Sequence, residues 1–307
     1  MKITKISSIA TIQDLGRFSY KSYGVNESGA LDKWSFMLGN ALLGNDLNAP
    51  AIEVILGGIE IYCNKAMTFC ITGANYEAFI DEKPIHNNYR IRIEAGKTLR
   101  LIRAMSGMCA YICAYGGFSA DFVLNSASTN LSASFGGFNG RALKIGDELS
   151  IGSRMNLSQI AVSRIKPRDK IRIIKGAEWE LFSDEAKHNL LNQEFNISSS
   201  SNRMGYRLNS DFKLNLINEL SLPSHGVSAG TIQVPSSGEP IVLLKDAQTT
   251  GGYPKIAQVI EADLGLFAQS RINSKISFEL VSIEEALMAK KERISHINQI
   301  KEYASEN

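Results

Sequence analysis

The sequence predicts a mostly β protein built from two barrel-like or sandwich-like halves, with only a few helices. Three observations lead to this fold class: many short runs are rich in β-branched residues, glycine turns separate them, and few windows show helical periodicity. The chain has 307 residues, of which 44% are hydrophobic and 21% charged, as is typical of a globular protein. This length is sufficient for two domains of ordinary size.

The expected strands lie on both sides of Pro167. Six precede it, at Ile52–Ile55, Ile59–Cys63, Met67–Thr72, Tyr89–Ile93, Thr98–Arg103 and Cys109–Tyr115. Five follow it, at Ile171–Ile174, Thr231–Val234, Ile241–Lys245, Ile256–Ile260 and Lys275–Val281. Runs this short, separated by turns, favour antiparallel sheets.

Three helices are expected. The first covers about Asp32–Leu43, with Asp32 as its N-cap, and a second covers about 184–191. The third begins after Ser282, because the Ser282 hydroxyl and the Glu285 carboxylate have the spacing of a capping box. This C-terminal helix should run towards Tyr303.

A basic run between Arg164 and Arg172 has Pro167 at its centre, which indicates a linker. We therefore expect a first β domain at 1–165, a second β domain at 166–290 that carries the main site, and a C-terminal helical tail at 291–307.

The charge balance and the apolar runs limit the partners. A net charge of +2 gives no general attraction to nucleic acid or to an anionic membrane. No apolar run reaches the length of a membrane span, and the first residues do not resemble a signal peptide. A cytoplasmic protein that binds neither nucleic acid nor membrane is expected.

The cysteines and histidines do not indicate a metal site. All four cysteines lie in apolar, strand-like segments, so buried free thiols are expected. The four histidines are scattered and no two of them have the spacing of metal ligands.

Familiar nucleotide and nucleophile motifs are missing. Gly96-Lys97-Thr98 ends like a phosphate-binding loop, but Ile91 stands where that loop needs a glycine, so a turn is the better interpretation. The chain has neither a dinucleotide-binding fingerprint nor a Gly-x-Ser-x-Gly elbow. We therefore expect this chain to bind no cofactor itself and to form no covalent intermediate.

Two loops at strand ends concentrate polar groups, namely 201–208 and 246–254. Arg203 offers a planar fork for carboxylate-like oxygens, and Asp246 can accept a hydrogen bond or a proton from an amide nitrogen. Together with Lys245, they are the candidate catalytic residues. The candidate substrate-binding residues are Asn202, Gln233, Gln248, Thr249, Thr250, Gly251, Gly252 and Tyr253. The alternative interpretation is a structural ion pair between Arg203 and Asp246, with the glycines only turning the chain.

Several motifs in a fixed order resemble those of the biotin-dependent carboxyltransferase family, also called the allophanate hydrolase subunit 2 type. They are 13–17, 28–32, 51–53, 136–141, 201–207, 230–235 and the very specific 245–254, and they span the chain up to about residue 289. The nearest resemblance is to the branch that forms the C subunit of bacterial ATP-dependent 5-oxoprolinase. The resemblance implies two cyclophilin-like β-barrels. It also implies a possible first-half site at Gln13, Asp14, Arg17, Asp32 and Glu53.

The same resemblance implies an activity and partners. The 5-oxoprolinase branch opens the lactam 5-oxoproline to L-glutamate, and it works with a B subunit of the allophanate hydrolase subunit 1 type and with an A subunit. ATP would be used by that complex, and the substrate would be a small amide or lactam. The alternatives are a carboxyltransferase that moves a carboxyl group from carboxybiotin to urea or a similar amide, and a regulatory protein that antagonises a histidine-kinase inhibitor. Biotin is implied only if the chain is a carboxyltransferase. Asn130 and Asn139 depart from the acids common at these positions, which leaves the charge of the 136–141 loop open.

Overall fold

The computed structural model describes residues 1–151, 157–218 and 221–306. These residues form two compact units, each assembled from separate segments of the chain. The first unit comprises Met1–Arg17, Ser28–Lys166 and Arg293–Asn307, and the second comprises Phe18–Glu27 and Pro167–Glu292. The sequence-based division into 1–165, 166–290 and 291–307 treats each domain as continuous and stays a prediction. In the structure, residues 18–27 group with the second unit.

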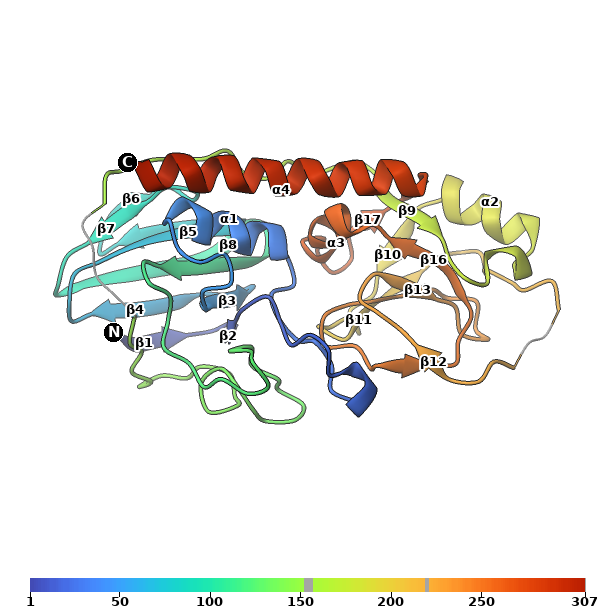
Figure 1. Cartoon of the computed structure of the whole chain (residues 1–307), viewed down its shortest axis with the longest axis horizontal. Helices are drawn as coiled ribbons and strands as arrows, with labels where there is room; N and C mark the ends of the chain where they lie inside the picture. The colour runs from blue at the N-terminus through green and yellow to red at the C-terminus, as the bar shows by residue number, and fades with distance from the viewer. Residues whose placement is uncertain (152–156, 219–220, 307) are drawn as a thin grey trace. The chain divides into compact units, whose positions relative to one another are not determined.

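The first unit contains an eight-stranded, antiparallel sheet that curves into a half-barrel (Figure 1). Its core strands follow the order β1-β4-β8-β3-β2, and β5 pairs with β6, β7 and β8. The strands are β1 (Lys2–Ile6), β2 (Ile9–Gln13), β3 (Ala51–Ile55), β4 (Ile59–Cys63), β5 (Met67–Ile80), β6 (Lys83–Ile85), β7 (Ile91–Ile93) and β8 (Lys97–Ala114). Alternate residues of these strands fill one apolar core.

Strands β5 and β8 are longer than expected. The sequence predicts two strands at 98–103 and 109–115, whereas β8 is one strand of 18 residues that includes Gly107. Gly107 has a φ of 82°, a conformation that glycine adopts without steric cost. The pairing of β5 with β8 shifts register three times between Gly73 and Ala78. Such bulges keep a long pair continuous while bending it, so the predicted break is a bend.

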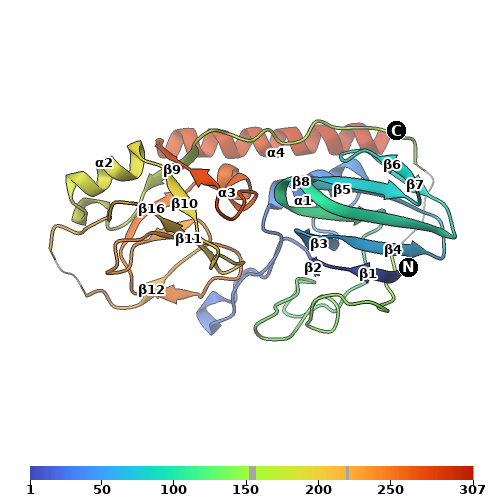
Figure 2. The same cartoon turned by 180° about the vertical axis from the view of Figure 1, so that it is seen from behind.

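Helix α1 (Lys33–Leu42) confirms the first predicted helix and its cap. The Ser35 amide donates to the Asp32 carboxylate at 3.1 Å, which satisfies an amide that the first turn leaves open. The helix packs on β5 and β8, as both views of the chain show (Figure 2). Trp34, Leu38 and Ala41 form a small cluster with Ile297, which lies in the second half of helix α4 (Ile283–Glu306).

Helix α4 also confirms its predicted start. The Ser282 amide donates to the Glu285 carboxylate at 2.7 Å, and the Glu285 amide donates to the Ser282 hydroxyl at 3.1 Å. These are the two reciprocal bonds of a capping box. Near the other end, the buried Arg90 guanidinium donates to the Leu42 and Ala304 carbonyls at 2.9 and 2.8 Å. A cation at the carboxyl ends of two helices complements their open carbonyls.

The second unit contains another eight-stranded sheet, which forms a nearly closed barrel, and a two-stranded ribbon. The order in the sheet is β17-β10-β11-β14-β13-β16-β9-β18, and only β9 and β18 pair in parallel among its described strands. The strands are β9 (Ile171–Lys175), β10 (Phe195–Ile197), β11 (Gly205–Asn209), β13 (Thr231–Gln233), β14 (Ile241–Leu243), β16 (Lys255–Val259), β17 (Lys275–Ile276) and β18 (Phe278–Leu280), and the ribbon consists of β12 (His225–Gly226) and β15 (Thr250–Gly251).

Two further α-helices and two 3-10 turns belong to the second unit. Helix α2 (Asp184–Asn192) confirms the second prediction, and the Ala186 amide donates to the Ser183 hydroxyl, which caps the helix. Helix α3 (Glu261–Ala268) is not predicted, because its turns are buried on several sides and show no polar face. The 3-10 turns are η1 (Lys21–Tyr23) and η2 (Trp179–Leu181). The mostly β fold with few helices and a C-terminal helix is therefore confirmed.

The thiols lie in the apolar interior, as expected from their strand-like surroundings. All four cysteines are buried and free. Burial raises the pKa of the Cys63 thiol to about 11, so this group is protonated and a poor nucleophile at neutral pH. In the described ranges, no helix is both long and apolar enough to span a membrane.

Candidate functional site

The 245–254 motif is a loop between β14 and β16, two strands of the second unit that lie on either side of β13. It starts where β14 ends, at Leu243, and leads into β16 at Lys255. Its middle part, Thr250–Gly251, forms β15 and pairs with β12, and the Val227 amide donates to the Thr249 carbonyl at 3.0 Å. The short ribbon therefore fixes the loop at the end of the barrel strands.

Arg203 and Asp246 form the ion pair that the sequence suggested. The Arg203 Nε and Nη2 atoms donate to the two Asp246 carboxylate oxygens at 2.8 and 3.1 Å, which is a bidentate arrangement. The two side chains are 10% and 11% exposed, so solvent screens the pair little. The Asp246 amide also donates to the Arg203 carbonyl at 3.0 Å. The two candidate loops are thus joined by both backbone and side chains.

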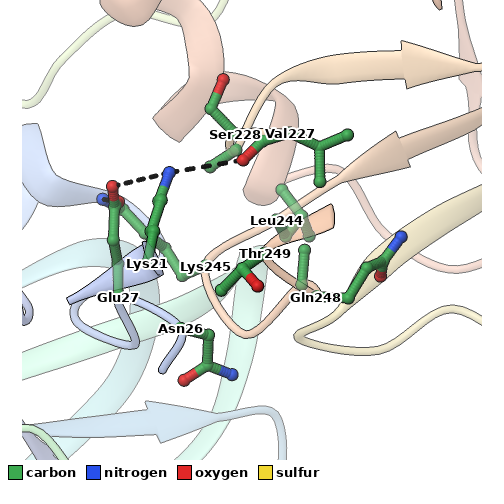
Figure 3. A pocket seen from close by; sticks show the side chains of 11 residues that line it. Lys21, Asn26, Glu27, Val227, Ser228, Leu244, Lys245, Gln248 and Thr249 are labelled. Carbon is green, nitrogen blue, oxygen red and sulfur yellow. Dashed lines mark hydrogen bonds and ion pairs between the residues drawn. The ribbon is translucent and has the colours of Figure 1, made fainter. Parts of the chain in front are cut away.

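Lys245 points into a small pocket next to this pair. Its side chain is 9% exposed, and its ammonium lies 3.5 Å from the Glu27 carboxylate. The other oxygen of Glu27 lies 2.9 Å from the Lys21 ammonium, which is also 3.5 Å from the Val227 carbonyl (Figure 3). One carboxylate thus lies between two lysines.

The pocket is almost filled by its own walls. Its lining residues are Lys21, Asn26, Glu27, Val227, Ser228, Ala229, Leu244, Lys245, Ala247, Gln248 and Thr249. Its cavity volume is about 10 Å³, which is the space that one water molecule needs. Asn26 also donates to the Asp246 carbonyl at 3.0 Å, which ties the segment 18–27 to the motif loop. A ligand larger than a water molecule would fit only if one of these side chains moved.

The charges of this pocket shift one another's pKa. Burial lowers the pKa of the Lys245 ammonium, and the neighbouring charges of Lys21 and Arg203 lower it further, whereas the Glu27 carboxylate opposes the shift. Burial alone would raise the pKa of the Glu27 carboxyl. The charges and hydrogen bonds of Lys245 and Lys21 outweigh burial and hold this pKa below 4.5. Glu27 is therefore ionised at neutral pH, and its charge favours the ammonium form of Lys245.

This shift predicts a pH-dependent effect of Glu27→Gln. Because the pKa of Glu27 is lower in the folded state than in the unfolded state, its ionised form stabilises the fold above about pH 4.5, and this contribution is lost as the pH falls through the folded value. The variant should unfold at a lower temperature than the natural protein at pH 7, by a difference worth about 1 kcal/mol or less. Thermal melts between pH 3 and pH 7 should show the two proteins converging in acid. An equal difference at every pH would contradict the prediction.

The remaining motif residues divide between two places. Gln248 and Thr249 line the pocket, whereas Gly252 and Tyr253 line a separate, wider groove with Pro235 and Pro254. Thr250 lies in the ribbon and is exposed. The sequence treats these residues as one set, and the structure brings only the first part of them to Lys245.

Gln233 connects the two parts of the motif. The Gln233 side chain accepts a hydrogen bond from Gln248 Nε2 at 3.4 Å and donates to the Tyr253 carbonyl at 3.2 Å. A Cβ atom at position 251 would lie 2.8 Å from Gln233 Nε2, so a larger residue there would require the end of the Gln233 side chain to move. Asn202 has a local role, since its side-chain oxygen accepts the Met204 amide at 2.8 Å.

The first-half candidates lie inside the first unit. Gln13, Asp14, Arg17, Asp32 and Glu53 are all at most 3% exposed. The Asp14 carboxylate accepts four hydrogen bonds of 2.5–2.8 Å: from the Gly16 and Ala127 amides and from the Ser126 and Ser128 hydroxyls. A carboxylate held by that many internal donors organises the loop around it.

The other four candidates are held in the same way. Gln13 accepts the Gly29 amide at 3.1 Å, and Glu53 accepts the Leu31 amide at 2.9 Å and the Tyr111 hydroxyl at 2.8 Å. Asp32 caps α1, and the Arg17 guanidinium donates to the Ser128 carbonyl and stacks 4.6 Å from the centre of the Phe135 ring. These contacts support the fold of the first unit, and a ligand site there stays a prediction.

Sequence reasoning missed the lysine and the carboxylate that complete the pocket. Lys21, Asn26 and Glu27 lie more than 200 positions before Lys245, in a segment with neither strand nor helix periodicity. It also missed a second charged cluster, in which Lys255 contacts His225 and the Glu178 carboxylate accepts the Lys255 amide at 2.8 Å. No spacing in the sequence links these positions, so only the folded chain reveals them.

Comparison with known proteins places the chain in a family. The profile of the family described as carboxyltransferase domain, subdomain A and B, matches residues 23–280. A protein of Haemophilus influenzae, named as the C subunit of 5-oxoprolinase, is 44% identical, and the match covers 99% of this chain and 98% of that protein. A protein of Escherichia coli with the same name is 38% identical, with 98% and 97% covered.

A solved structure agrees with these sequence matches. The structure of the Kluyveromyces lactis urea carboxylase superposes with a TM-score of 0.90 at 26% identity. That match covers 99% of this chain but only 29% of the larger protein. The predicted family resemblance is confirmed. The chain belongs to the carboxyltransferase domain, subdomain A and B, family.

Proposed function

We propose that this chain is the C subunit of an ATP-dependent 5-oxoprolinase, a multisubunit amide hydrolase that opens 5-oxoproline to L-glutamate. The observation that carries the proposal is the near-complete match, in both directions, to two proteins that are named as this component of 5-oxoprolinase. Matching over whole chains is stronger support than the match to the urea carboxylase, of which this chain spans less than a third. We further propose that the complex works in the cytoplasm.

The pocket beside Lys245 suits a small amide. A lactam presents a carbonyl oxygen that accepts hydrogen bonds and an N–H group that donates one. Lys245 and Thr249 line the pocket, and Arg203 lies next to it on the side of Asp246. These donors can polarise the carbonyl, and each well-placed donor is worth about 3 kcal/mol in the transition state. Gln248 and Asp246 supply acceptors for the N–H side.

The Arg203–Asp246 pair leaves Asp246 able to act. A carboxylate has about four acceptor positions, and Arg203 uses one on each oxygen. In this proposal, the guanidinium holds the carboxylate in place, and a remaining lone pair meets the substrate N–H. The structural and the functional interpretations of the pair are therefore compatible.

In this proposal, the ATP-consuming steps take place on other subunits. An A subunit together with a B subunit of the allophanate hydrolase subunit 1 type would complete the enzyme, and ATP would be used outside this chain. The alternative function is that of a carboxyltransferase, and the structural similarity to the protein named urea carboxylase supports it. Carboxybiotin would then arrive as a substrate on a carrier protein.

The deciding experiment is co-expression with candidate A and B subunits, followed by assay of glutamate release from 5-oxoproline. We expect one stable complex in size-exclusion chromatography and glutamate release that requires ATP. Urea should cause no ATP-dependent carboxylation in the same preparation. Separate elution of the three chains, or turnover of urea and biotin without turnover of 5-oxoproline, would overturn the proposal.

A further inference from the structure

The pocket beside Lys245 holds an internal carboxylate where a substrate carboxylate would fit. Glu27 lies between the ammonium groups of Lys21 and Lys245, at 2.9 and 3.5 Å (Figure 3). Lysine ammonium groups are compact point charges that accept a carboxylate in several orientations. The same two cations would therefore bind a carboxylate of similar size from another molecule.

The charges around the pocket leave one positive charge uncompensated. Lys21 and Lys245 contribute two positive charges and Glu27 one negative charge, while Arg203 and Asp246 neutralise each other. Lys245 is nearly buried, and Lys21 is 35% exposed, so water screens only part of this charge. An excess cation in a poorly hydrated site favours a bound anion. A neutral amide in the place of Glu27 would leave both lysine charges uncompensated.

The size of the pocket indicates how the anion would enter. With a cavity of about 10 Å³, the site cannot take a ligand in addition to its present side chains. Glu27 ends the segment 18–27, which is described throughout and contains a 3-10 turn but no strand. Side-chain contacts tie it to the motif loop and the ribbon: Lys21 to the Val227 carbonyl at 3.5 Å and Asn26 to the Asp246 carbonyl at 3.0 Å. Displacing one carboxylate by another conserves both volume and charge.

We propose that Lys21 and Lys245 bind the carboxylate of the substrate in the place that Glu27 occupies, so that Glu27 is an internal competitor and the site selects lactams that carry a carboxylate. This inference rests on the proposed function and extends it to the substrate class. It assigns to Lys21 a role in substrate specificity, and it moves Lys245 from the lactam carbonyl to the carboxylate, which leaves Thr249 and Arg203 as the donors to the carbonyl. A carboxylate held there lies beside Gln248 and Thr249, which are then in reach of the lactam ring.

The test compares two lactams that differ only in the carboxylate, 5-oxoproline and 2-pyrrolidinone, on the assembled complex. In Lys21→Met, the KM for 5-oxoproline should rise about tenfold or more, the usual effect of losing a contact between charged groups, while kcat changes little. Inhibition by 2-pyrrolidinone should be weak and equal in both proteins. In Glu27→Gln, the KM should fall, because the competing charge is gone. Lys213→Met, which removes a half-exposed lysine paired with Glu239, is the matched control and should change neither constant.

The outcomes separate the inference from the proposed function. An active complex in which Lys21→Met leaves the KM unchanged, or weakens 2-pyrrolidinone equally, overturns the inference and leaves the proposed function standing. If no complex turns over 5-oxoproline, the proposed function fails, and calorimetry then tests the inference alone. Binding of 5-oxoproline that Lys21→Met abolishes would support it. Equal or tighter binding of 2-pyrrolidinone or urea would overturn it.

Discussion

Asp246→Asn should lower kcat/KM of the assembled enzyme by about 10²-fold or more, the usual scale for losing a positioned acid–base group. In the natural protein, Arg203 donates to both carboxylate oxygens of Asp246, at 2.8 and 3.1 Å. The asparagine amide is as large as the carboxylate and still offers one oxygen to Arg203. The cost in stability should therefore stay below about 2 kcal/mol. Steady-state kinetics and thermal melts of the purified complex measure both quantities.

The control for Asp246→Asn is Glu239→Gln, which removes an ion pair between half-exposed side chains of the same unit. Such pairs contribute about 1 kcal/mol or less, and this one lies outside the pocket. An Asp246→Asn enzyme with natural kcat/KM would refute the assigned role of Asp246. If that enzyme also lost about 3 kcal/mol of stability, the pair would be structural only.

Asp263→Ala should produce the largest loss of stability in the second unit, about 3–5 kcal/mol. The Asp263 side chain is fully buried and accepts three bonds from Arg172: from Nε at 2.8 Å, from Nη2 at 2.7 Å and from the backbone amide at 3.1 Å. Hydrogen bonds to Asp263 raise the pKa of the Arg172 guanidinium although burial lowers it. Arginine is not deprotonated in proteins, so Asp263→Ala would leave a charged guanidinium without this partner. Chemical denaturation followed by circular dichroism would measure the loss.

A double variant tests the cause of that loss. Removing both partners, as in Asp263→Leu with Arg172→Met, takes away the unpaired charge and should recover part of the stability. A double variant as unstable as the sum of the two single changes would show that packing, and not the unpaired charge, dominates. An Asp263→Ala protein that loses less than about 1 kcal/mol would contradict the prediction altogether.

Local signals explain which parts of the fold could be predicted. The helix caps at Asp32 and Ser282 depend on residues within three positions, and both form as expected. Helix α3 was not predicted, because it is buried on several sides and so lacks the polar face that a helical pattern in the sequence requires. Strand β8 was predicted as two strands, because a glycine such as Gly107 within a strand pattern indicates an interruption. In the structure, pairing with β5 continues past Gly107 through shifts in register, so β8 is one strand.

The candidate site shows the same limit. Arg203, Asp246 and Lys245 belong to loops with an unusual density of polar residues, and that density is visible in the sequence. Glu27 and Lys21 carry no such signal, because their role arises only from lying next to Lys245 in space. Contacts across more than 200 positions depend on tertiary packing, which neither propensity nor periodicity encodes.

The interleaving of the two units has a consequence for biosynthesis. The chain passes from one unit to the other at residues 17–18, 27–28, 166–167 and 292–293. Because the first unit includes the part of helix α4 from Arg293 onward, it cannot be complete until that part has been made, although strand β1 is made much earlier. Domains made early usually fold early. In this chain, the buried Arg90 of the first unit cannot form its hydrogen bond to the Ala304 carbonyl until Ala304 has been made. Until Ile297 has been made, the apolar side chains of Trp34, Leu38 and Ala41 lack this residue, against which they pack in the folded unit.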